Sequence, residues 1–363
     1  MPGLDSQLPP FPDDVPTHPL LVIDYELISS GDNVEVEKLW KSATNVGFWY
    51  LKNHGTDREV KEMFEMGAET MRLPLDEKMQ FERGDSGESF GYKAAGLNAI
   101  DEKGNLYTAE SINVSKDDAL AYPKVVHRTY PSTVNNRMDS ILKPFVRKSV
   151  EVNNTILSIF EEKLGLPAGT LVNLHSVDNP SGSEARCIKS PPRRAHLAAS
   201  EDKIKVSLEA HTDFGSLSFL HLRLGGLQVL PPGGTEWQYV RPLSGLAICN
   251  VGDTLTLLSG GILRSNIHRV VPAPGAQAAY TRWSLVFFTR PGNDVYLRPL
   301  ANESEAVRTA VAGMSEEVRK MYHPDATARE WFARRIMNQI AKNRTGKETW
   351  HASREMEHAP GAT

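Results

Sequence analysis

Two short segments of the chain carry side chains that could together bind a metal ion. His211 and Asp213 are two residues apart, so on a β-strand their imidazole and carboxylate would point to the same face. His268 follows much later and could supply a second imidazole from another strand. Two histidines and one carboxylate form a facial set that suits iron(II) and leaves coordination positions open for O₂ and a bidentate co-substrate. Ligand type alone leaves zinc and manganese as alternatives.

A second pair of residues could bind a carboxylate. Arg282 and Ser284 are also two residues apart on a β-prone run, and the same face continues through Val286 and Phe288. A guanidinium that opens an otherwise apolar inward row is costly unless an anion accompanies it. An isolated pair of this kind is more often part of a structural salt bridge. Beside a metal triad, it predicts a site for an anion held by charge-assisted hydrogen bonds.

The elements that must position these residues are short β-prone runs between about residues 185 and 300, separated by Gly, Pro and Asn. Many short strands at close spacing predict a sandwich or a barrel, and a barrel can bring strands distant in sequence side by side. The expected strands cover residues 207–208, 217–222, 227–230, 246–249, 254–258, 269–272 and 283–289.

The flanking parts of the chain have helical patterns. Apolar residues recur at helical spacing over 138–164, which predicts a long helix, and Asp32 with Glu35 predicts the start of an earlier one. We expect an α+β protein with a mainly β core. Its N-terminal helical and mixed region covers 1–184, its core 185–300, and its C-terminal helices and tail 301–363, all in one compact unit.

Composition favours chemistry on a small molecule. With 363 residues, 40% of them hydrophobic, the chain can bury a sizeable core, and a net charge of -4 gives no reason to expect nucleic acid or a membrane as a partner. Cys187 and Cys249 are the only cysteines and do not form a disulfide framework or a thiolate metal site. The sequence shows no signal-peptide pattern and no apolar run that could span a bilayer, so we expect a cytoplasmic monomer or weak homodimer.

Several longer segments resemble the iron(II)/2-oxoglutarate-dependent dioxygenases of the isopenicillin N synthase-like family, and together they cover most of the chain. They read NVGFWYLKNHG at 45–55, HTDFGSLSFL at 211–220, GGLQVL at 225–230, NVGDTLTLLSGG at 250–261, RSNIHRV at 264–270 and RWS at 282–284. The resemblance implies a double-stranded β-helix, or jelly roll, flanked by N-terminal and C-terminal helices. It also implies that His211, Asp213 and His268 ligate Fe(II), while Arg282 and Ser284 bind the far carboxylate of 2-oxoglutarate.

The chain departs from the family pattern just before the metal motif. Relatives often carry Arg-x-Asn-Tyr-Tyr-Pro-Pro there, with a tyrosine that reaches the co-substrate, whereas Lys189 and Ser190 hold the tyrosine positions in this chain. Lys189 either contacts the co-substrate or an anionic substrate, or extends to solvent at the barrel rim. We expect Tyr92, Lys189 and Phe288 to line the substrate pocket, with residues 84–96 and the C-terminal helices as a lid.

The resemblance implies oxidation of a small organic molecule, coupled to conversion of 2-oxoglutarate and O₂ into succinate and CO₂. Hydroxylation, desaturation and radical rearrangement all stay open, and specialised (secondary) metabolism is the leading expectation. One alternative is an oxidase of the same fold that uses O₂ without 2-oxoglutarate and holds its substrate's own carboxylate with Arg282 and Ser284. Another is a non-catalytic jelly-roll protein that binds a ligand or a protein partner.

Overall fold

The computed structural model describes residues 8–99, 105–192 and 208–352, and within them two β-sheets form a jelly roll. The major sheet runs in the order β1 (Val22–Asp24), β2 (Phe48–Lys52), β10 (Ala247–Val251), β7 (Leu217–Leu222), β12 (Arg282–Thr289), β5 (Glu184–Ser190), β4 (Glu110–Ser115) and β3 (Gly91–Lys93). The minor sheet runs in the order β6 (Leu208–His211), β11 (His268–Val270), β8 (Leu227–Val229) and β9 (Gln238–Tyr239). The expected jelly-roll fold is confirmed.

Side chains of the major sheet alternate between two environments, as the period of a strand requires. On β12, Leu285 and Phe287 are fully buried against helices, whereas Ser284, Val286 and Phe288 line a pocket between the sheets. The inner face therefore carries the side chains that could do chemistry, and the outer face carries the hydrophobic core.

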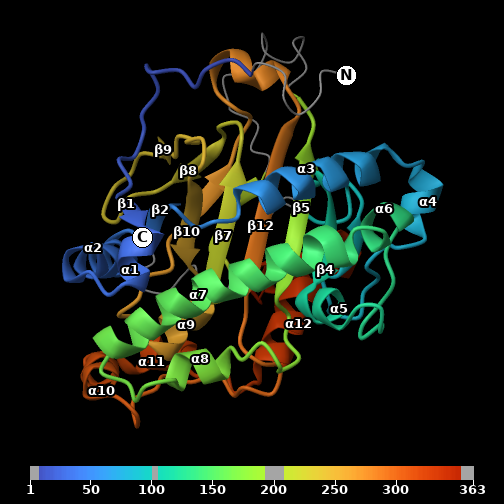
Figure 1. Cartoon of the computed structure of the whole chain (residues 1–363). Helices are drawn as coiled ribbons and strands as arrows, with labels where there is room; N and C mark the ends of the chain where they lie inside the picture. The colour runs from blue at the N-terminus through green and yellow to red at the C-terminus, as the bar shows by residue number, and fades with distance from the viewer. Residues whose placement is uncertain (1–7, 100–104, 193–207, 353–363) are drawn as a thin grey trace.

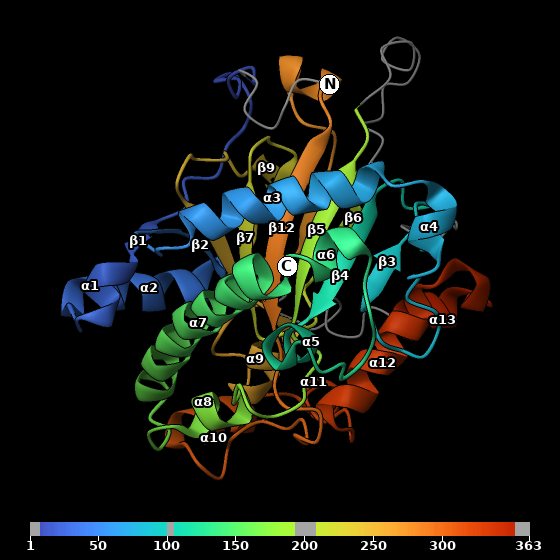
Figure 2. The same cartoon turned by 45° about the vertical axis from the view of Figure 1, so that its right-hand side comes forward.

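Two long helices cover the outer face of the major sheet. α3 (Asp57–Arg72) and α7 (Lys143–Lys163) both lie across β12, as the two views show (Figure 1, Figure 2). Gly67 allows α3 to approach closely, because a Cβ there would lie 2.1 Å from Sγ of Cys187 on β5. The expected helix over 138–164 is confirmed as a π-helical turn, η1 (Met138–Leu142), that leads into α7.

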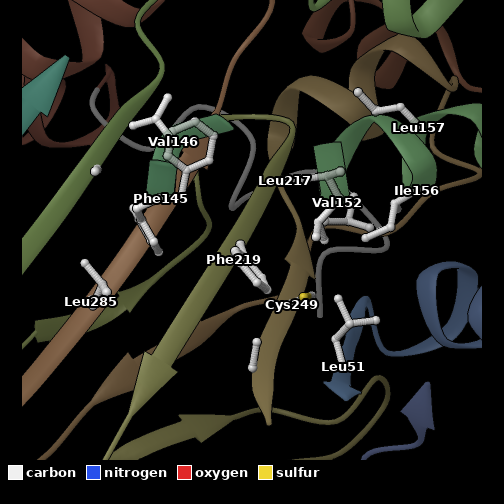
Figure 3. Close-up of a cluster of buried hydrophobic side chains, with 14 of the residues drawn as sticks. Leu51, Phe145, Val146, Val152, Ile156, Leu157, Leu217, Phe219, Cys249 and Leu285 are labelled. Carbon is white, nitrogen blue, oxygen red and sulfur yellow. The ribbon is translucent and has the colours of Figure 1, made fainter. Parts of the chain in front are cut away.

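The core between α7 and the sheet is a continuous apolar cluster (Figure 3). Phe145, Val152 and Ile156 of α7 face Leu217 and Phe219 of β7, and each of these five side chains is at most 2% exposed. Burying a side chain of this size stabilises the fold by roughly 1.5–3 kcal/mol. The helix thus fixes the major sheet from behind.

The remaining helices are short and lie around the two sheets. They are α1 (Tyr25–Ser29), α2 (Asn33–Asn45), α4 (Leu75–Met79), α5 (Lys116–Ala121), α6 (Ser132–Asn135), α8 (Thr170–Leu174), α9 (Asp253–Leu258), η3 (Gly275–Ala279), α10 (Glu305–Ala312), α11 (Glu316–Met321), α12 (Ala328–Gln339), η4 (Ala341–Asn343) and α13 (Lys347–Ala352). Asp32 caps α2 as expected, although the Glu35 carboxylate accepts from the Asp24 amide rather than closing the capping box. In the described ranges no helix combines the length and the apolar character needed to cross a membrane.

One expected strand is wrong. Residues 254–258 form part of the helix α9, not a strand, and all the residues of α9 are buried. The run Thr254-Leu255-Thr256-Leu257 alternates polar and apolar residues as a strand does, so its local pattern misled the prediction. The other strands expected between 217 and 289 are present within one or two residues of their predicted ends; of the one expected at 207–208, only Leu208 lies in the described part, where it begins β6.

The N-terminal region contributes strands to the same major sheet as the core. β2 pairs with β10 along one side, and β4 pairs with β5 on the other. Phe48 of β2 also reaches the minor sheet, where its ring packs edge-on against that of His268 at 5.3 Å. The walls of the pocket are therefore built from segments far apart in the sequence.

Candidate active site

The structure brings His211, Asp213 and His268 together between the two sheets. His211 and His268 are register partners on β6 and β11, and their ring centroids are 4.3 Å apart. Oδ1 of Asp213 lies 3.9 Å from Nε2 of His211 and 3.7 Å from Nε2 of His268. One ligand atom from each residue falls within 4.8 Å of the others, so a single ion could touch all three. Two imidazole nitrogens and a carboxylate oxygen suit a borderline divalent ion such as iron(II).

Neighbouring groups orient the three side chains toward this common point. Oδ2 of Asp213 accepts hydrogen bonds from the Ser218 hydroxyl on β7 and from Asn250 on β10, the latter at 2.8 Å, which leaves Oδ1 turned toward the imidazoles. Nδ1 of His268 lies 3.1 Å from the carbonyl of Asn266, so a proton on that nitrogen leaves the Nε2 lone pair free for a metal. Sequence reasoning identified neither Ser218 nor Asn250 as a partner of Asp213.

The Asp213 carboxyl stays ionised in this setting. Burial alone raises its pKa, but the adjacent imidazoles and its two hydrogen-bond donors hold that pKa below its ordinary value. A partly buried carboxylate beside two imidazoles is a site that a divalent cation would stabilise.

Arg282 and Ser284 also face the pocket, and both are buried. Nη1 of Arg282 donates to the Ser284 hydroxyl at 2.6 Å, and Nε donates to the Gly225 carbonyl at 2.7 Å. Burial lowers the pKa of Arg282 to about 10, which leaves the guanidinium charged at neutral pH. Within the described residues no carboxylate forms an ion pair with it, so the pocket holds a fixed cation ready for an anion.

The three expected substrate residues fall in two places. Phe288 lines the pocket, as do Phe332 and Ile336 of the C-terminal helix α12. The role of residues 84–96 and the C-terminal helices as a lid stays a prediction. Tyr92 and Lys189 do not support the expectation: both contact Glu110, at 2.6 Å and 2.8 Å, on the other side of the sheet.

Strand parity explains that difference. On β5, Arg186, Ile188 and Ser190 line the pocket, so Lys189 between them must point the opposite way. Ser190 is the register partner of Arg282. The serine therefore occupies the inward position where relatives often carry a tyrosine.

Further polar side chains line the pocket and were missed from the sequence, among them Lys93, Tyr107 and Arg186. Lys93 comes from β3, Arg186 from β5, and Tyr107 from the segment that precedes β4. Arg186 could have been predicted, because residues two apart on a strand share a face and it lies two and four residues before Ile188 and Ser190. Lys93 and Tyr107 lie in a region whose sequence shows no clear strand period, so no local signal marked them.

A jelly roll with two histidines and a carboxylate on its inner face defines a non-haem metal-dependent oxygenase. Residues 189–291 match the family model described as the 2OG-Fe(II) oxygenase superfamily, and residues 20–135 match the N-terminal region of the non-haem dioxygenases described for morphine synthesis. The chain belongs to the 2OG-Fe(II) oxygenase superfamily.

Individual relatives and solved structures agree with this assignment. A 2-oxoglutarate-dependent dioxygenase of Aspergillus fumigatus is 26% identical over 93% of this chain and 91% of its own length. Gibberellin 20 oxidase 2 of Oryza sativa subsp. indica is 30% identical over 77% of this chain and 69% of its own. The fold is similar to that of a full-length Neurospora crassa protein crystallised in complex with alpha-KG, with a TM-score of 0.70 and 21% identity over 87% of this chain and 95% of that one.

The chain is thus an Fe(II)/2-oxoglutarate-dependent dioxygenase, with O₂ as its second co-substrate. This result favours the predicted reaction class over an oxidase that works without 2-oxoglutarate and over a non-catalytic binding protein.

Proposed function

We propose that His211, Asp213 and His268 hold the iron(II) and that Arg282 with Ser284 binds the distal carboxylate of 2-oxoglutarate. The observation that carries this proposal is the shared pocket: the three potential ligands and the buried, charged Arg282 all line it. When bound, the iron supplies activation of O₂, so that oxidation of a substrate C–H bond is coupled to conversion of 2-oxoglutarate and O₂ into succinate and CO₂.

The protein positions the co-substrate through a guanidinium that is already fixed. The hydrogen bonds to Gly225 and Ser284 hold two edges of the Arg282 group, so little side-chain entropy is lost when a carboxylate binds. Burial among strands excludes water, which strengthens the charge interaction. Ser190, opposite Arg282 on β5, is placed to add a hydroxyl contact to the same carboxylate.

The remainder of the pocket suits a small organic molecule with an apolar body. Its apolar lining comprises Phe48, Leu208, Leu220, Leu227, Val270, Val286, Phe288, Phe332 and Ile336. A lining of this kind excludes water from a reactive site and holds a carbon skeleton beside the metal. We propose a substrate from specialised metabolism; hydroxylation, desaturation and rearrangement are all compatible with such a pocket.

We further propose that the enzyme acts in the cytoplasm, as a monomer or weak homodimer, on a small molecule rather than on nucleic acid or a membrane. The net charge of -4 and the two buried, unpaired cysteines, Cys187 and Cys249, support this proposal.

Substitution of the ligands tests the iron assignment. His211→Ala and Asp213→Ala each remove one of three donors, so we expect purified variants given iron(II), 2-oxoglutarate and O₂ to form no measurable succinate, while the wild-type enzyme does. Circular dichroism establishes that each variant is folded. Wild-type rates of succinate formation in both variants would overturn the assignment.

A further inference from the structure

A cluster of cations lies on one side of the pocket, around a single carboxylate. Glu184 is fully buried and forms ion pairs with Arg186 and Arg290, while its second oxygen accepts from the Ser89 hydroxyl at 2.6 Å. Lys93 and Arg83 belong to the same cluster, because the charges of Arg186 and Glu184 affect the pKa of each. The basic side chains of this cluster thus outnumber its one fully buried acid, Glu184.

Two members of this cluster already have their polar partners. Nη2 of Arg83 donates to Oδ1 of Asn98 at 2.6 Å, with Glu82 as a nearby acid, and Arg290 donates to the Gly182 carbonyl. The negative charge of Asp213, a proposed metal ligand, also favours the charged form of Arg290. Arg83 does not line the pocket, and Arg290 lines it but has its charge offset by Glu184 and Asp213.

Lys93 and Arg186 also line the pocket, and each has donor capacity left for a ligand. In the described part of the chain Lys93 forms no hydrogen bond or ion pair, and its Nζ lies 4.2 Å from the centre of the Tyr107 ring. Arg186 gives one nitrogen to Glu184, and its Nε is buried without a partner, as are the Nε atoms of Arg83 and Arg290. Burial, together with Arg83 and Arg186, lowers the pKa of Lys93 well below its ordinary value, so an anion bound here would favour the ammonium form.

The Arg186 end of this position is separate from the proposed co-substrate site, whereas Lys93 lies in the register row of Ser284, three strands away. Arg186 is the register partner of Val286, four residues along β12 from Arg282, which corresponds to ~13 Å along the strand. The guanidinium of Arg186 lies over the ring of Phe288, at 4.9 Å from its centre. A molecule bound to Arg186 would therefore lie along the apolar wall formed by Phe288 and Phe332, and not at Arg282.

We propose that Lys93 and Arg186 bind a carboxylate of the organic substrate, and that the substrate class is an apolar carboxylic acid. The proposal rests on the proposed function, because it assigns the substrate of the same pocket. One negative charge matches the two groups that have capacity left, and the apolar lining accepts the rest of the molecule. Tyr107, packed against Lys93, would fix the ammonium beside that carboxylate.

Binding to the anaerobic Fe(II) enzyme tests this proposal without turnover. The probes are octanoate, dodecanoate and phenylbutanoate, the methyl ester of each, and phenyl phosphate, titrated by calorimetry before and after 2-oxoglutarate is added. We expect at least one acid to bind about tenfold or more tightly than its ester. Lys93→Gln and Arg186→Gln should each remove most of that preference, and Lys93→Arg should retain it.

Lys189→Gln is the matched control, because Lys189 is a cation on β5 that faces the opposite side of the sheet. It should leave the preference for the acid intact. Arg186→Gln also breaks an ion pair with Glu184, so Lys93→Gln is the decisive variant if Arg186→Gln does not fold.

Three results would overturn the proposal: no acid preferred over its ester, an unchanged preference in Lys93→Gln, or phenyl phosphate bound more tightly than every acid. The titrations without 2-oxoglutarate test the proposed substrate class independently of the proposed co-substrate site. If the wild-type enzyme does not bind 2-oxoglutarate, the proposed co-substrate site is contradicted. The comparison of each acid with its ester stays valid in that case.

Discussion

At the scale of single residues, the site depends on which face of a strand each side chain occupies. Ser284, Val286 and Phe288 of β12 point into the pocket, and Leu285 and Phe287 point into the core. A shift of one position moves a side chain from the reactive pocket to the hydrophobic core. An inward-facing charged group such as Arg282 can therefore reach a ligand in the pocket, whereas an outward-facing one such as Lys189 cannot.

Arg282 gives a prediction at this scale. Arg282→Gln removes a buried charge that would contact the distal carboxylate of 2-oxoglutarate, and a hydrogen bond to a charged group is worth about 1.5–3 kcal/mol. We expect the Kd for 2-oxoglutarate to rise roughly 10- to 100-fold, measured by calorimetry with the Fe(II) enzyme under anaerobic conditions. Lys189→Gln is the control, with no expected change. An unchanged Kd in Arg282→Gln would place the co-substrate elsewhere.

The sequence was informative about residues where the pattern had a clear period. His211 with Asp213, and Arg282 with Ser284, were found because a spacing of two on a strand sets a common face. Lys189 was assigned to the pocket from its motif position alone, although the register of β5 turns it away. Lys93 could not be found, since its strand has only three residues and no recognisable alternation.

At the scale of elements, α12 is tied to the metal motif through one buried ion pair. Nη1 of Arg335 lies 2.6 Å from Oδ2 of Asp253, and both side chains are fully buried. The Thr212 hydroxyl, between two proposed metal ligands, donates to the same carboxylate oxygen at 2.9 Å. The helix that covers the pocket is thereby coupled to the segment that carries His211 and Asp213.

Arg335→Leu tests this coupling. Removal of one partner leaves the Asp253 carboxylate buried without its main counter-charge, which typically costs about 3–5 kcal/mol. We expect a loss of this size in the free energy of unfolding measured with urea. Arg329→Leu, at an exposed site on the same helix, should change it by less than about 0.5 kcal/mol. Equal stability of the two variants would show that the ion pair does not anchor α12.

The helix α9 shows why some elements escaped prediction. Its amides at Asp253 and Thr254 donate to the carbonyls of Asp213 and Gly215, and a Cβ on Gly252 would lie 2.2 Å from the Gly215 oxygen. These contacts join segments about forty residues apart, so the local sequence does not indicate them. Tertiary contacts, rather than strand propensity, decided the conformation.

At the scale of the whole molecule, the pocket exists because three distant parts of the chain complete one jelly roll. The N-terminal region supplies Phe48 and Lys93, the core supplies the proposed metal ligands, and α12 supplies Phe332. The boundaries at 184/185 and 300/301 stay predictions. The general fold class could be predicted from strand spacing and from family motifs. How the three parts assemble could not, because it depends on strand pairings such as β2 with β10.

Buried histidines should make the whole molecule sensitive to acid. Burial lowers the pKa of His175 to about 4, and it also lowers the pKa values of His54 and His221. A folded-state pKa below the unfolded value of about 6.5 means that the stabilising contribution is present above pH 6.5 and is lost as the pH falls toward 4. For His175 alone the loss amounts to about 3 kcal/mol.

Urea unfolding at a series of pH values from neutral to acidic measures this effect. His175→Gln removes one of the titrating groups, so its stability should fall less steeply with acid than that of the wild type, even if the variant is less stable at neutral pH. Identical slopes for the two proteins would contradict the role assigned to His175.

The most direct test of the account is an anaerobic titration of the Fe(II)-loaded enzyme with 2-oxoglutarate, followed by visible absorption. If the triad and Arg282 together form the co-substrate site, the wild-type enzyme develops the metal-to-ligand charge-transfer band of a chelated keto acid and saturates at one equivalent. Asp213→Ala should show no band, and Arg282→Gln should need a higher concentration to develop it. A wild-type enzyme that binds iron at this site yet gives no band with saturating 2-oxoglutarate would contradict the central claim.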